Sequence, residues 1–500
     1  MMLPLNEEAM QNFDYLKEIP YLSDLYAYCH TAEITQRTNP GASALSGRQA
    51  LEWLVRAIYQ MKNIEVDTSR KRASLFELVD GEPFKDFVEN DRLMMAVHYI
   101  RKVGNCAAHL GMVTPKESFF SLLNLYNFVG AVLVKLQVVP DFPAFRKELI
   151  PDDTVVYKVS KELPQPDAVF VEHIDTEKIK KEPVETRPTE LTEAETRQYF
   201  IDMMLREAGW EAVKKRGAIS PLKACIEVEV QGMPNESGTG YADYVLFGAD
   251  GKPLAVIEAK RTSADKEKGR KQAALYADCL EQRYGIRPVI YCTNGYHTEV
   301  LDGLGYPYRD VYGFHTVKDL ELLIQRRNRR LITDLRINDS ITDREYQKRA
   351  IRQVCERFNR YHRRTLLVMA TGTGKTRVAI SLTDVLMRNG WVKDVLFLAD
   401  RTALVRQAKK NFVKLLPSVT TCVLSEDKKP DKLARVMFST YQTMINYIDK
   451  ETKDFSVGRF DLVIIDEAHR SVFGKYTAIF DYFDSLLVGL TATPRDEVER

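Results

Sequence analysis

The chain has 500 residues, of which 45% are hydrophobic and 28% are charged, and its formal net charge is +2. This composition is typical of a globular protein, and the length predicts three or more domains, because a single hydrophobic core does not extend over so many residues. The nearly balanced charge excludes a uniformly basic surface, so any surface for nucleic acid must be local.

The cysteines and the apolar segments restrict the cellular setting. The seven cysteines are scattered and form no CxxC pair, which argues against a structural zinc site or a disulfide framework and favours a reducing cytoplasm. The N-terminus shows no secretory apolar segment, and we expect no apolar run long enough to span a membrane.

The first part of the chain, residues 1–145, is predicted to be an all-α domain. Apolar residues recur at helical spacing in SGRQALEWLVRAIYQM, in DRLMMAVHYIRKVGNCAAHLG and in ESFFSLLNLYNFVGAVLVKL. Ser46, at the start of the first of these segments, is a candidate N-cap. Residues 146–190 are rich in Pro, Glu and Lys with little apolar periodicity, which predicts a linker.

A second, α/β domain is predicted for residues 191–315. It begins with a helix over Thr192–Trp210, and two apolar strands then flank an Asp-Gly pair in GYADYVLFGADGKPLAVIEAKR. If Asp250 and Gly251 form a two-residue turn, Ala249 faces Lys252 and Asp243 falls opposite Glu258. One residue of slip would put the two acids on opposite faces.

Two carboxylates opposed across a strand pair repel each other, and a divalent cation would offset that repulsion. Asp243 and Glu258 are therefore candidate Mg²⁺ ligands. Lys260 lies two residues beyond Glu258, hence on the same face, where it could stabilise a phosphorane or help to activate water. A surface ion cluster is the alternative interpretation.

A basic helical connector is predicted for residues 316–340, and a second α/β domain for residues 341–500. In the latter, apolar runs such as TLLVMA, DVLFLAD and DLVIID alternate with helices, as in a parallel sheet covered on both faces. The first run is expected to be a buried strand that leads into a phosphate-binding loop. The residues that would cradle the phosphates and hold Mg²⁺ are Gly372, Thr373, Gly374, Lys375 and Thr376.

The apolar run DLVIID ends in a second pair of acids. Asp466 is expected to hold Mg²⁺ and Glu467 to orient the attacking water. ATGTGKT, DEAH at 466–469 and TATP at 491–494 resemble the motifs of superfamily 2 helicases and translocases, although Met369 stands where the strict phosphate-loop pattern has Gly.

That resemblance covers about residues 342–495 and implies further roles. Gln347 would read adenine, and LADRTALVRQ and FSTYQTM would contact the DNA backbone. The residues implied to couple hydrolysis to strand movement are His469, Thr491 and Thr493.

Asp243 and Glu258-Ala259-Lys260 resemble the PD-(D/E)xK nuclease signature, with Tyr-Ala in place of the Pro that often precedes the Asp. In such nucleases Glu195, on the preceding helix, would be a further acid. Gln272 and Tyr276 in QAALY resemble the Gln-x-x-x-Tyr element of some members, and they lie one helical turn apart. For these two residues helix surface and core packing remain the alternative.

In the helical domain, IRKVGNCAAHLG resembles a domain fused to restriction subunits and related to the HEPN group. Arg101 and His109 correspond to the ribonuclease pair of that group, but their spacing is wider than usual. We therefore expect packing or partner contact here and no catalysis.

The order of helical domain, PD-(D/E)xK nuclease and superfamily 2 motor resembles the restriction subunit of a type I restriction–modification enzyme. This resemblance implies a cytoplasmic enzyme that uses ATP and Mg²⁺, pumps double-stranded DNA and cuts it remote from the recognition site. Its partners would be methyltransferase and specificity subunits, and no membrane is involved. Because the chain stops after TATP, it is expected to be a fragment without the second RecA-like lobe.

Two other interpretations remain open. The chain could belong to a stand-alone antiphage helicase–nuclease without a methyltransferase partner. It could also be a DNA-binding module in which both catalytic sites are degenerate.

Overall fold

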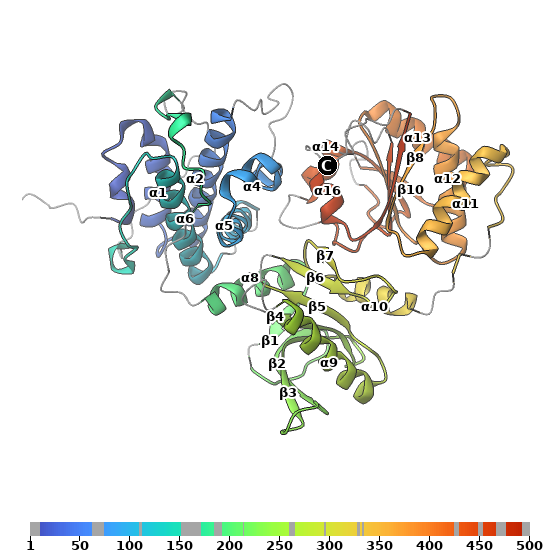
Figure 1. The fold of residues 1–500 in the computed structure, drawn as a ribbon, viewed down its shortest axis with the longest axis horizontal. Helices are drawn as coiled ribbons and strands as arrows, with labels where there is room; N and C mark the ends of the chain where they lie inside the picture. The colour runs from blue at the N-terminus through green and yellow to red at the C-terminus, as the bar shows by residue number, and fades with distance from the viewer. Residues whose placement is uncertain are drawn as a thin grey trace, which may run out of the picture. The chain divides into compact units, whose positions relative to one another are not determined.

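The computed structural model describes residues 11–492 apart from 63–74, 110–112, 152–171, 185–192, 214, 260–265, 295–296, 328–330, 333–334, 425–429, 449–453 and 467–476. The chain divides into two compact units, Met1–Phe200 and Ile201–Arg500. Unit 1 is helical and unit 2 contains two β-sheets (Figure 1).

Unit 1 is built around α2, which packs against α1, α5 and α6. Its helices are α1 (Ser23–Ile34), α2 (Pro40–Met61), α3 (Leu75–Asp80), α4 (Glu82–Val88), α5 (Asp91–His109) and α6 (Pro115–Lys135), with the 3-10 helices η1 (Asn12–Leu16), η2 (Pro20–Leu22), η3 (Lys147–Leu149) and η4 (Thr176–Lys178). Helix α8 (Glu193–Glu207) crosses the boundary between the two units.

The helix starts in unit 1 follow local capping chemistry. Helix α2 begins at Pro40, where the Asn39 side chain accepts a hydrogen bond from Ala42 N, so the prediction of Ser46 as its N-cap is wrong. Asn39-Pro40 is itself a strong start signal, because Asn caps well and Pro suits the first helical position. Ser46 is instead buried within the helix.

Helix α6 is long and apolar enough to cross a membrane by length and composition, which corrects the expectation that no segment reaches that length. Of its most apolar window, 72% is buried inside the protein. A helix that is apolar on all sides is typical of the interior of a large helical domain. The burial shows that α6 is a core helix of unit 1.

Part of the predicted linker contacts the helices of unit 1. Lys180 N donates to Lys135 O at the end of α6, and Val184 N donates to Val88 O at the end of α4. Asn90 Nδ2 also donates to Val184 O. Residues 172–184 therefore satisfy orphan carbonyls at helix C-termini, which Pro- and Lys-rich sequence does not reveal.

The first sheet of unit 2, here called the mixed sheet, has seven strands in the order β1-β2-β3-β4-β5-β6-β7. The β1–β2 and β4–β5 pairs are parallel and the other pairs are antiparallel. The strands are β1 (Glu211–Val213), β2 (Lys223–Gln231), β3 (Thr239–Phe247), β4 (Pro253–Ala259), β5 (Val289–Thr293), β6 (Thr298–Leu301) and β7 (Arg309–Val311).

Two helices pack against the middle of the mixed sheet. Helix α9 (Lys266–Tyr284) connects the parallel strands β4 and β5 and packs on both, and α10 (Val317–Arg326) also contacts β4 (Figure 1). Helix α10 begins with a capping box between Thr316 and Asp319. These helices explain why β4 and β5 are almost entirely apolar and buried.

The second sheet is fully parallel, with the order β10-β11-β9-β12-β13-β8, as expected from its apolar strands. Helices α11, α12 and α13 lie on one side of it and α14 and α16 on the other (Figure 1). The strands are β8 (Arg364–Val368), β9 (Val395–Ala399), β10 (Thr421–Val423), β11 (Val436–Thr440), β12 (Leu462–Asp466) and β13 (Leu486–Thr491), and the helices are α11 (Glu345–Asn359), α12 (Lys375–Arg388), α13 (Thr402–Leu415), α14 (Tyr441–Ile448) and α16 (Thr477–Tyr482).

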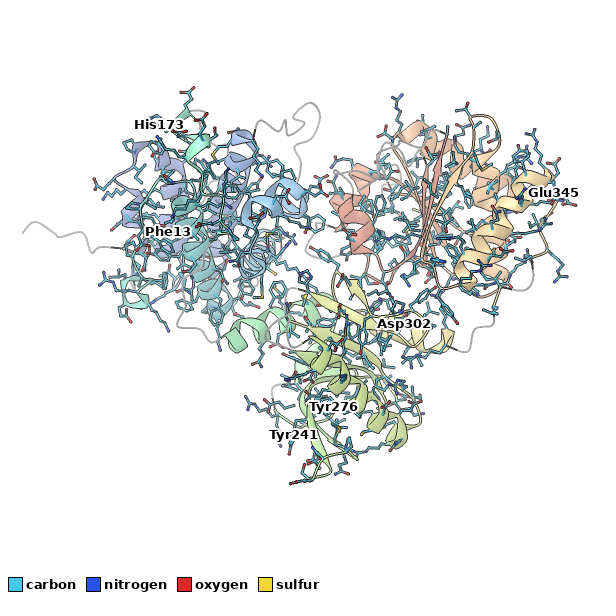
Figure 2. The ribbon with its side chains drawn as sticks, viewed as in Figure 1. Phe13, His173, Tyr241, Tyr276, Asp302 and Glu345 are labelled. Atoms are coloured by element: carbon cyan, nitrogen blue, oxygen red, sulfur yellow. The ribbon has the colours of Figure 1, made fainter. Side chains whose placement is uncertain are left out.

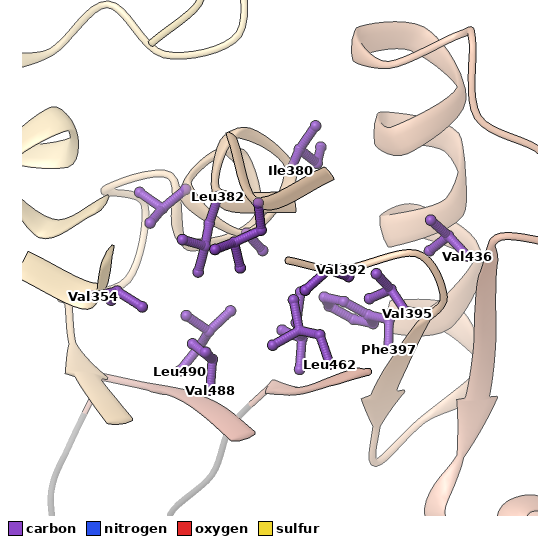
Figure 3. Packing of buried hydrophobic residues seen from close by; sticks show 14 of the residues in the cluster. Val354, Ile380, Leu382, Val392, Val395, Phe397, Val436, Leu462, Val488 and Leu490 are labelled. Carbon is purple, nitrogen blue, oxygen red and sulfur yellow. The ribbon is translucent and has the colours of Figure 1, made fainter. Parts of the chain in front are cut away.

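The core between the parallel sheet and α11–α13 contains Val395, Phe397, Val436 and Leu462 from adjacent strands (Figure 3). One expectation for this sheet is wrong. Strand β8, which leads into the phosphate loop, lies at the sheet edge, and Leu366 and Val368 are 49% and 53% exposed. An apolar run alone does not distinguish a central strand from an edge strand that is covered on one face.

We predict that Val395→Ala lowers the free energy of unfolding of the parallel-sheet domain by about 2–3 kcal/mol, because it removes two methyl groups from a fully buried site and leaves a cavity. The matched control is Val413→Ala on α13, where Val413 is 48% exposed. That change should alter stability by less than about 0.5 kcal/mol, since Ala is a better helix former than Val. Urea unfolding measures both, and equal effects would contradict the assigned core.

Candidate active sites

The hairpin that carries the first acid pair turns differently from the prediction. Gly248, not Ala249, pairs with Lys252, and Gly251 N donates to Gly248 O. The loop therefore has three residues, with Gly251 at a φ of +73°. This left-handed residue closes a three-residue hairpin loop at no steric cost.

A bulge restores the expected register. Phe247 pairs with Pro253, whereas Leu246 pairs with Ala255, so Leu254 is an extra residue on β4. Beyond the bulge, Val245 pairs with Val256 and Tyr244 with Ile257. The longer loop and the bulge shift the register in opposite directions. The next positions along the two strands are Asp243 and Glu258, which therefore face each other. The sequence analysis predicted this register, but from a two-residue turn that the structure does not contain.

Asp243 and Glu258 lie at the end of the β3–β4 pair. Ala259 N donates to Asp243 Oδ2 over 2.6 Å, so the Asp243 side chain reaches the end of β4. Glu258 is buried, and Asp243 is half-buried. In the part of the chain that the structure describes, no group of three or more His, Cys, Asp or Glu side chains is placed to hold a metal. Two carboxylates nevertheless fit Mg²⁺, because this ion keeps several waters and is often held by one or two carboxylates.

Tyr276 and Gln272 on α9 adjoin this acid pair. Gln272 Nε2 donates to the Tyr276 hydroxyl over 2.7 Å. Burial raises the pKa of Tyr276, and the nearby charges of Glu258 and Asp243 raise it further. The phenol therefore stays protonated and can donate a hydrogen bond. The structure thus brings Asp243, Glu258, Gln272 and Tyr276 together.

Gly240 on β3 is a part of this site that the sequence did not indicate. A Cβ at Gly240 would lie 2.7 Å from Cε1 of Tyr276, so only glycine lets the tyrosine ring approach β3. Figure 2 labels Tyr276 and the neighbouring Tyr241, which is 60% exposed. A glycine directly before an exposed aromatic residue gives no sign of this role until the helix that packs on it is known.

The phosphate loop joins β8 to α12. Gly372 and Gly374 have φ of +77° and +90°, and α12 begins at Lys375. Thr373 Oγ1 donates to Ala370 O, which closes the loop. A glycine-rich turn at a helix N-terminus directs backbone N–H groups toward an anion, so the loop can hold phosphate groups.

The parallel register brings other residues of the predicted ATP site to the same edge of the sheet. Asp466 pairs with Leu490, and Thr491 pairs with Val368, the last residue of β8. Met369 N also donates to Thr491 O. The carboxyl ends of β8, β12 and β13 are therefore neighbours, and ligands bind at such ends in α/β folds.

Gln347 packs against the phosphate loop. It is 2% exposed, and its Nε2 donates to Thr373 O over 2.6 Å. The hydroxyl of Tyr346 donates to the same carbonyl. A Cβ on Gly374 would overlap the Gln347 amide. The adenine contact of Gln347 stays a prediction, whereas the structure shows that its amide contacts the phosphate loop.

Several predicted residues cannot be placed. Lys260, Glu467, His469 and Thr493 lie outside the described residues. Glu195 lies in α8 and His109 in α5, but their side chains are also outside what the structure describes. Arg101 is 4% exposed, with its guanidinium over the Phe76 ring, 4.9 Å from the centroid. This burial agrees with the packing role expected for Arg101.

The fold and these sites define a RecA-like helicase lobe preceded by a mixed-sheet α/β domain. The family described as "Type III restriction enzyme, res subunit" matches residues 340–496. The endonuclease subunit of the type I restriction enzyme EcoKI from Escherichia coli K12 is 27% identical over 62% of this chain and 33% of its own length. That of EcoAI from Escherichia coli is 29% identical over 62% of this chain and 40% of its own length.

A solved structure gives a similar match. A fragment described as the HsdR subunit of a type I restriction enzyme from Vibrio vulnificus YJ016 is 26% identical, covers 62% of this chain and 57% of the fragment, and has a TM-score of 0.25. The chain spans less than half the length of the two curated relatives above. The similarity to the family model and to the two curated relatives confirms the resemblance to type I restriction subunits with a helicase lobe that the motifs indicated.

We predict that Glu258→Gln changes the melting temperature differently in the absence and in the presence of Mg²⁺. Without metal, the change relieves the repulsion between Asp243 and Glu258, so the melting temperature should rise or stay level. The Mg²⁺-dependent rise of the wild type should largely disappear, because ligand stabilisation requires binding to the native state. Thermal melts in EDTA and in Mg²⁺ measure both effects.

The control for this experiment is Glu229→Gln, an exposed acid on the adjacent strand β2. It should leave the Mg²⁺ response unchanged. An unaltered response in Glu258→Gln would remove this residue from the metal site.

We predict that Gly374→Ala weakens Mg·ATP binding at least tenfold, because the new Cβ meets Gln347 and the residue must adopt a positive φ. The control is Gly390→Ala after the other end of α12, where φ is +70° and a Cβ meets nothing within 4 Å. That change should cost about 1–2 kcal/mol of stability through backbone strain and leave binding unchanged. Isothermal titration with ATP tests the pair, and similar affinities would contradict the assignment.

Proposed function

We propose that this chain contains the motor and the nuclease of a type I restriction subunit, which translocates double-stranded DNA with ATP and cuts it remote from the recognition site. The observation that carries the proposal is the presence, within one compact unit, of a paired-carboxylate site and a RecA-like phosphate loop. The similarity to type I endonuclease subunits supports the same combination.

In this proposal the mixed sheet belongs to a PD-(D/E)xK nuclease domain. Asp243 and Glu258 hold Mg²⁺, which when bound polarises the scissile phosphate. The backbone N–H of Ala259 fixes the orientation of Asp243. Lys260 follows β4 in the sequence and would offer positive charge to the phosphate. The protonated hydroxyl of Tyr276 would donate a hydrogen bond to the same phosphate. Glu195 would contribute a further acid.

The RecA-like lobe would bind Mg·ATP at the carboxyl edge of its sheet. Gly372, Thr373 and Gly374 cradle the phosphates, and Lys375 neutralises their charge. Thr376 and Asp466 hold the metal, and Glu467 orients the attacking water. Gln347 contacts both adenine and the loop, and His469 links the site to DNA.

The partners follow from the same assignment. Double-stranded DNA is the substrate, and methyltransferase and specificity subunits would supply recognition. Residues 1–145 would form the docking or organising domain, ahead of the nuclease at 191–315, the connector at 316–340 and the motor lobe from 341. A cytoplasmic location agrees with the seven cysteines, all of which are free thiols.

The test is cleavage of duplex DNA by the subunit assembled with candidate methyltransferase and specificity subunits. Lys375→Ala should abolish ATP turnover and ATP-dependent cutting together, because translocation precedes the cut. Asp243→Asn should abolish cutting and leave ATP turnover near normal. Lys414→Ala, an exposed lysine in the last turn of α13, is the control and should change neither.

The outcomes separate the alternatives. Cutting that needs no methyltransferase or specificity subunit would identify a stand-alone helicase–nuclease. Absence of both activities in the assembled wild type would identify a DNA-binding module, and the proposal would be withdrawn.

A further inference from the structure

One buried carboxylate joins the two α/β domains of unit 2. Asp484 lies just before β13 in the RecA-like lobe, and its side chain is 4% exposed. Arg309 of β7 donates to both of its oxygens, with Nε–Oδ1 of 2.8 Å and Nη2–Oδ2 of 2.6 Å. Arg363, before β8, donates to Oδ1 over 2.6 Å. His315 Nε2, which follows β7, lies 3.3 Å from Oδ2. Mixed-sheet residues and motor residues therefore share one counter-ion.

The charges in this cluster are balanced. Burial would raise the pKa of Asp484, but Arg309 and Arg363 hold it well below its usual range, so the carboxylate stays ionised. Arg309 also pairs with Asp302 Oδ2 over 2.7 Å. The ring of Tyr306 faces both guanidiniums, with centroid distances of 5.8 Å to Arg309 and 4.9 Å to Arg363. Asp302, whose side chain is fully buried, is labelled in Figure 2.

A second ion pair lies beside the first. Arg326, in the last turn of α10, donates with both terminal nitrogens to Asp461, and the Nη2–Oδ2 distance is 2.8 Å. Asp461 lies just before β12, and its Oδ2 also accepts from Lys393 N and Asp394 N. A cavity of about 40 Å³ between the two pairs is lined by Arg309, Arg326, Asp461 and Asp484, which is room for a few ordered waters.

Asp461 and Asp484 lie at the ends of two strands that also carry residues of the predicted ATP site. Asp461 and Asp484 precede the amino ends of β12 and β13. The carboxyl ends of the same two strands are Asp466 and Thr491, beside the phosphate loop. Strand β13 therefore connects a contact with the mixed sheet to the ATP site, and β12 connects the ATP site to a contact with α10, which packs on β4. The rise along each strand is roughly 3.3 Å per residue.

Buried ion pairs add little net stability to a contact between two domains. Removing charges from water costs about as much as their attraction returns, so an apolar contact of the same size would stabilise as well or better. Forked Arg–carboxylate bonds do impose one geometry. The use of two such forks at the domain junction points to a requirement for position.

We propose that Asp484, supported by Asp461, is the positioning residue that fixes the mixed-sheet domain on the two ATP-site strands and so couples nucleotide state to DNA cutting. This inference rests on the proposed function for its cutting activity. It assigns no catalytic contact to Asp484, which acts through Arg309 and β13.

The first experiment uses the subunit in its assembled complex. Asp484→Asn keeps the shape of the side chain and removes its charge. It should leave ATP turnover and ATP-independent Mg²⁺ nicking within about twofold of wild type, and it should lower ATP-dependent cutting at least tenfold. The ATP consumed per cut should rise accordingly. The control is Asp384→Asn, which removes an acid paired with Arg388 on α12, away from the junction.

Two results would overturn the proposal. One is Asp484→Asn cutting as fast as wild type. The other is a proportional loss of ATP turnover, nicking and ATP-dependent cutting together with a lower melting temperature, which is the result of a merely structural role.

The second experiment needs no cutting activity. In wild type, a non-hydrolysable ATP analogue should slow amide hydrogen exchange in β6 and β7, although neither strand contributes to the phosphate loop. Asp384→Asn should keep this response. Arg309→Lys, which keeps the charge and loses the fork, should reduce it, and it replaces Asp484→Asn if that variant does not fold.

The two readouts separate the two hypotheses. If wild type does not cut DNA but its exchange responds to nucleotide as described, the proposed function fails, and only the coupling of the nucleotide site to the mixed sheet stands. If exchange in wild-type β6 and β7 is unaffected by nucleotide, the coupling is overturned whatever the cutting assay shows.

Discussion

The cost of burying charge determines where chemistry can lie in unit 2. The strands at the centre of both sheets are apolar because helices cover them, and an unpaired charge in such an interior is costly. The acids of the two candidate sites and of the domain junction lie where the apolar, paired stretches of strand begin or end. Asp243 and Glu258 lie at one end of the β3–β4 pair, and Asp466 lies at the carboxyl end of β12. Asp461 and Asp484 lie before the amino ends of β12 and β13.

Where a carboxylate is buried, the nature of its partners decides its charge. Asp484 is surrounded by guanidiniums, and its pKa is held well below the usual range. Glu33 in unit 1 is also buried, and it accepts hydrogen bonds from Asn12 and Phe13. Burial raises the pKa of Glu33, and these hydrogen bonds only partly oppose that effect. The donors to Glu33 are therefore neutral groups, whereas the donors to Asp484 at the domain junction include two guanidinium cations.

The phosphate loop follows an edge strand of the parallel sheet. In the part of the chain that the structure describes, β8 is the last strand of the parallel sheet and pairs with β13, and the exposed Leu366 and Val368 lie on one uncovered face of β8. Two hydrogen bonds hold the loop and its preceding residue. Gln347 Nε2 donates to Thr373 O, and Met369 N donates to Thr491 O. The residue that departs from the strict loop pattern thus uses its backbone, and not its side chain, in this contact.

The sequence by itself determined the local chemistry of this protein. Glycine spacing predicted the phosphate loop, apolar runs predicted the parallel strands, and the hairpin pattern predicted the Asp243–Glu258 pair. A resemblance added Gln272 and Tyr276, for which helix surface and core packing remained the alternative. The glycine spacing and the apolar runs are local signals, because they depend on residues a few positions apart, and the acid pair depends on the register of a single hairpin.

Only the tertiary structure decided the features that depend on distant residues. It showed that a bulge at Leu254 compensates for a longer turn, that Gly240 makes room for Tyr276, and that β8 lies at an edge. It also brought Arg309 and Asp484, 175 positions apart, into one buried ion cluster. No periodicity or motif encodes such a pair, because burial of its charges depends on how two separately folded sheets meet.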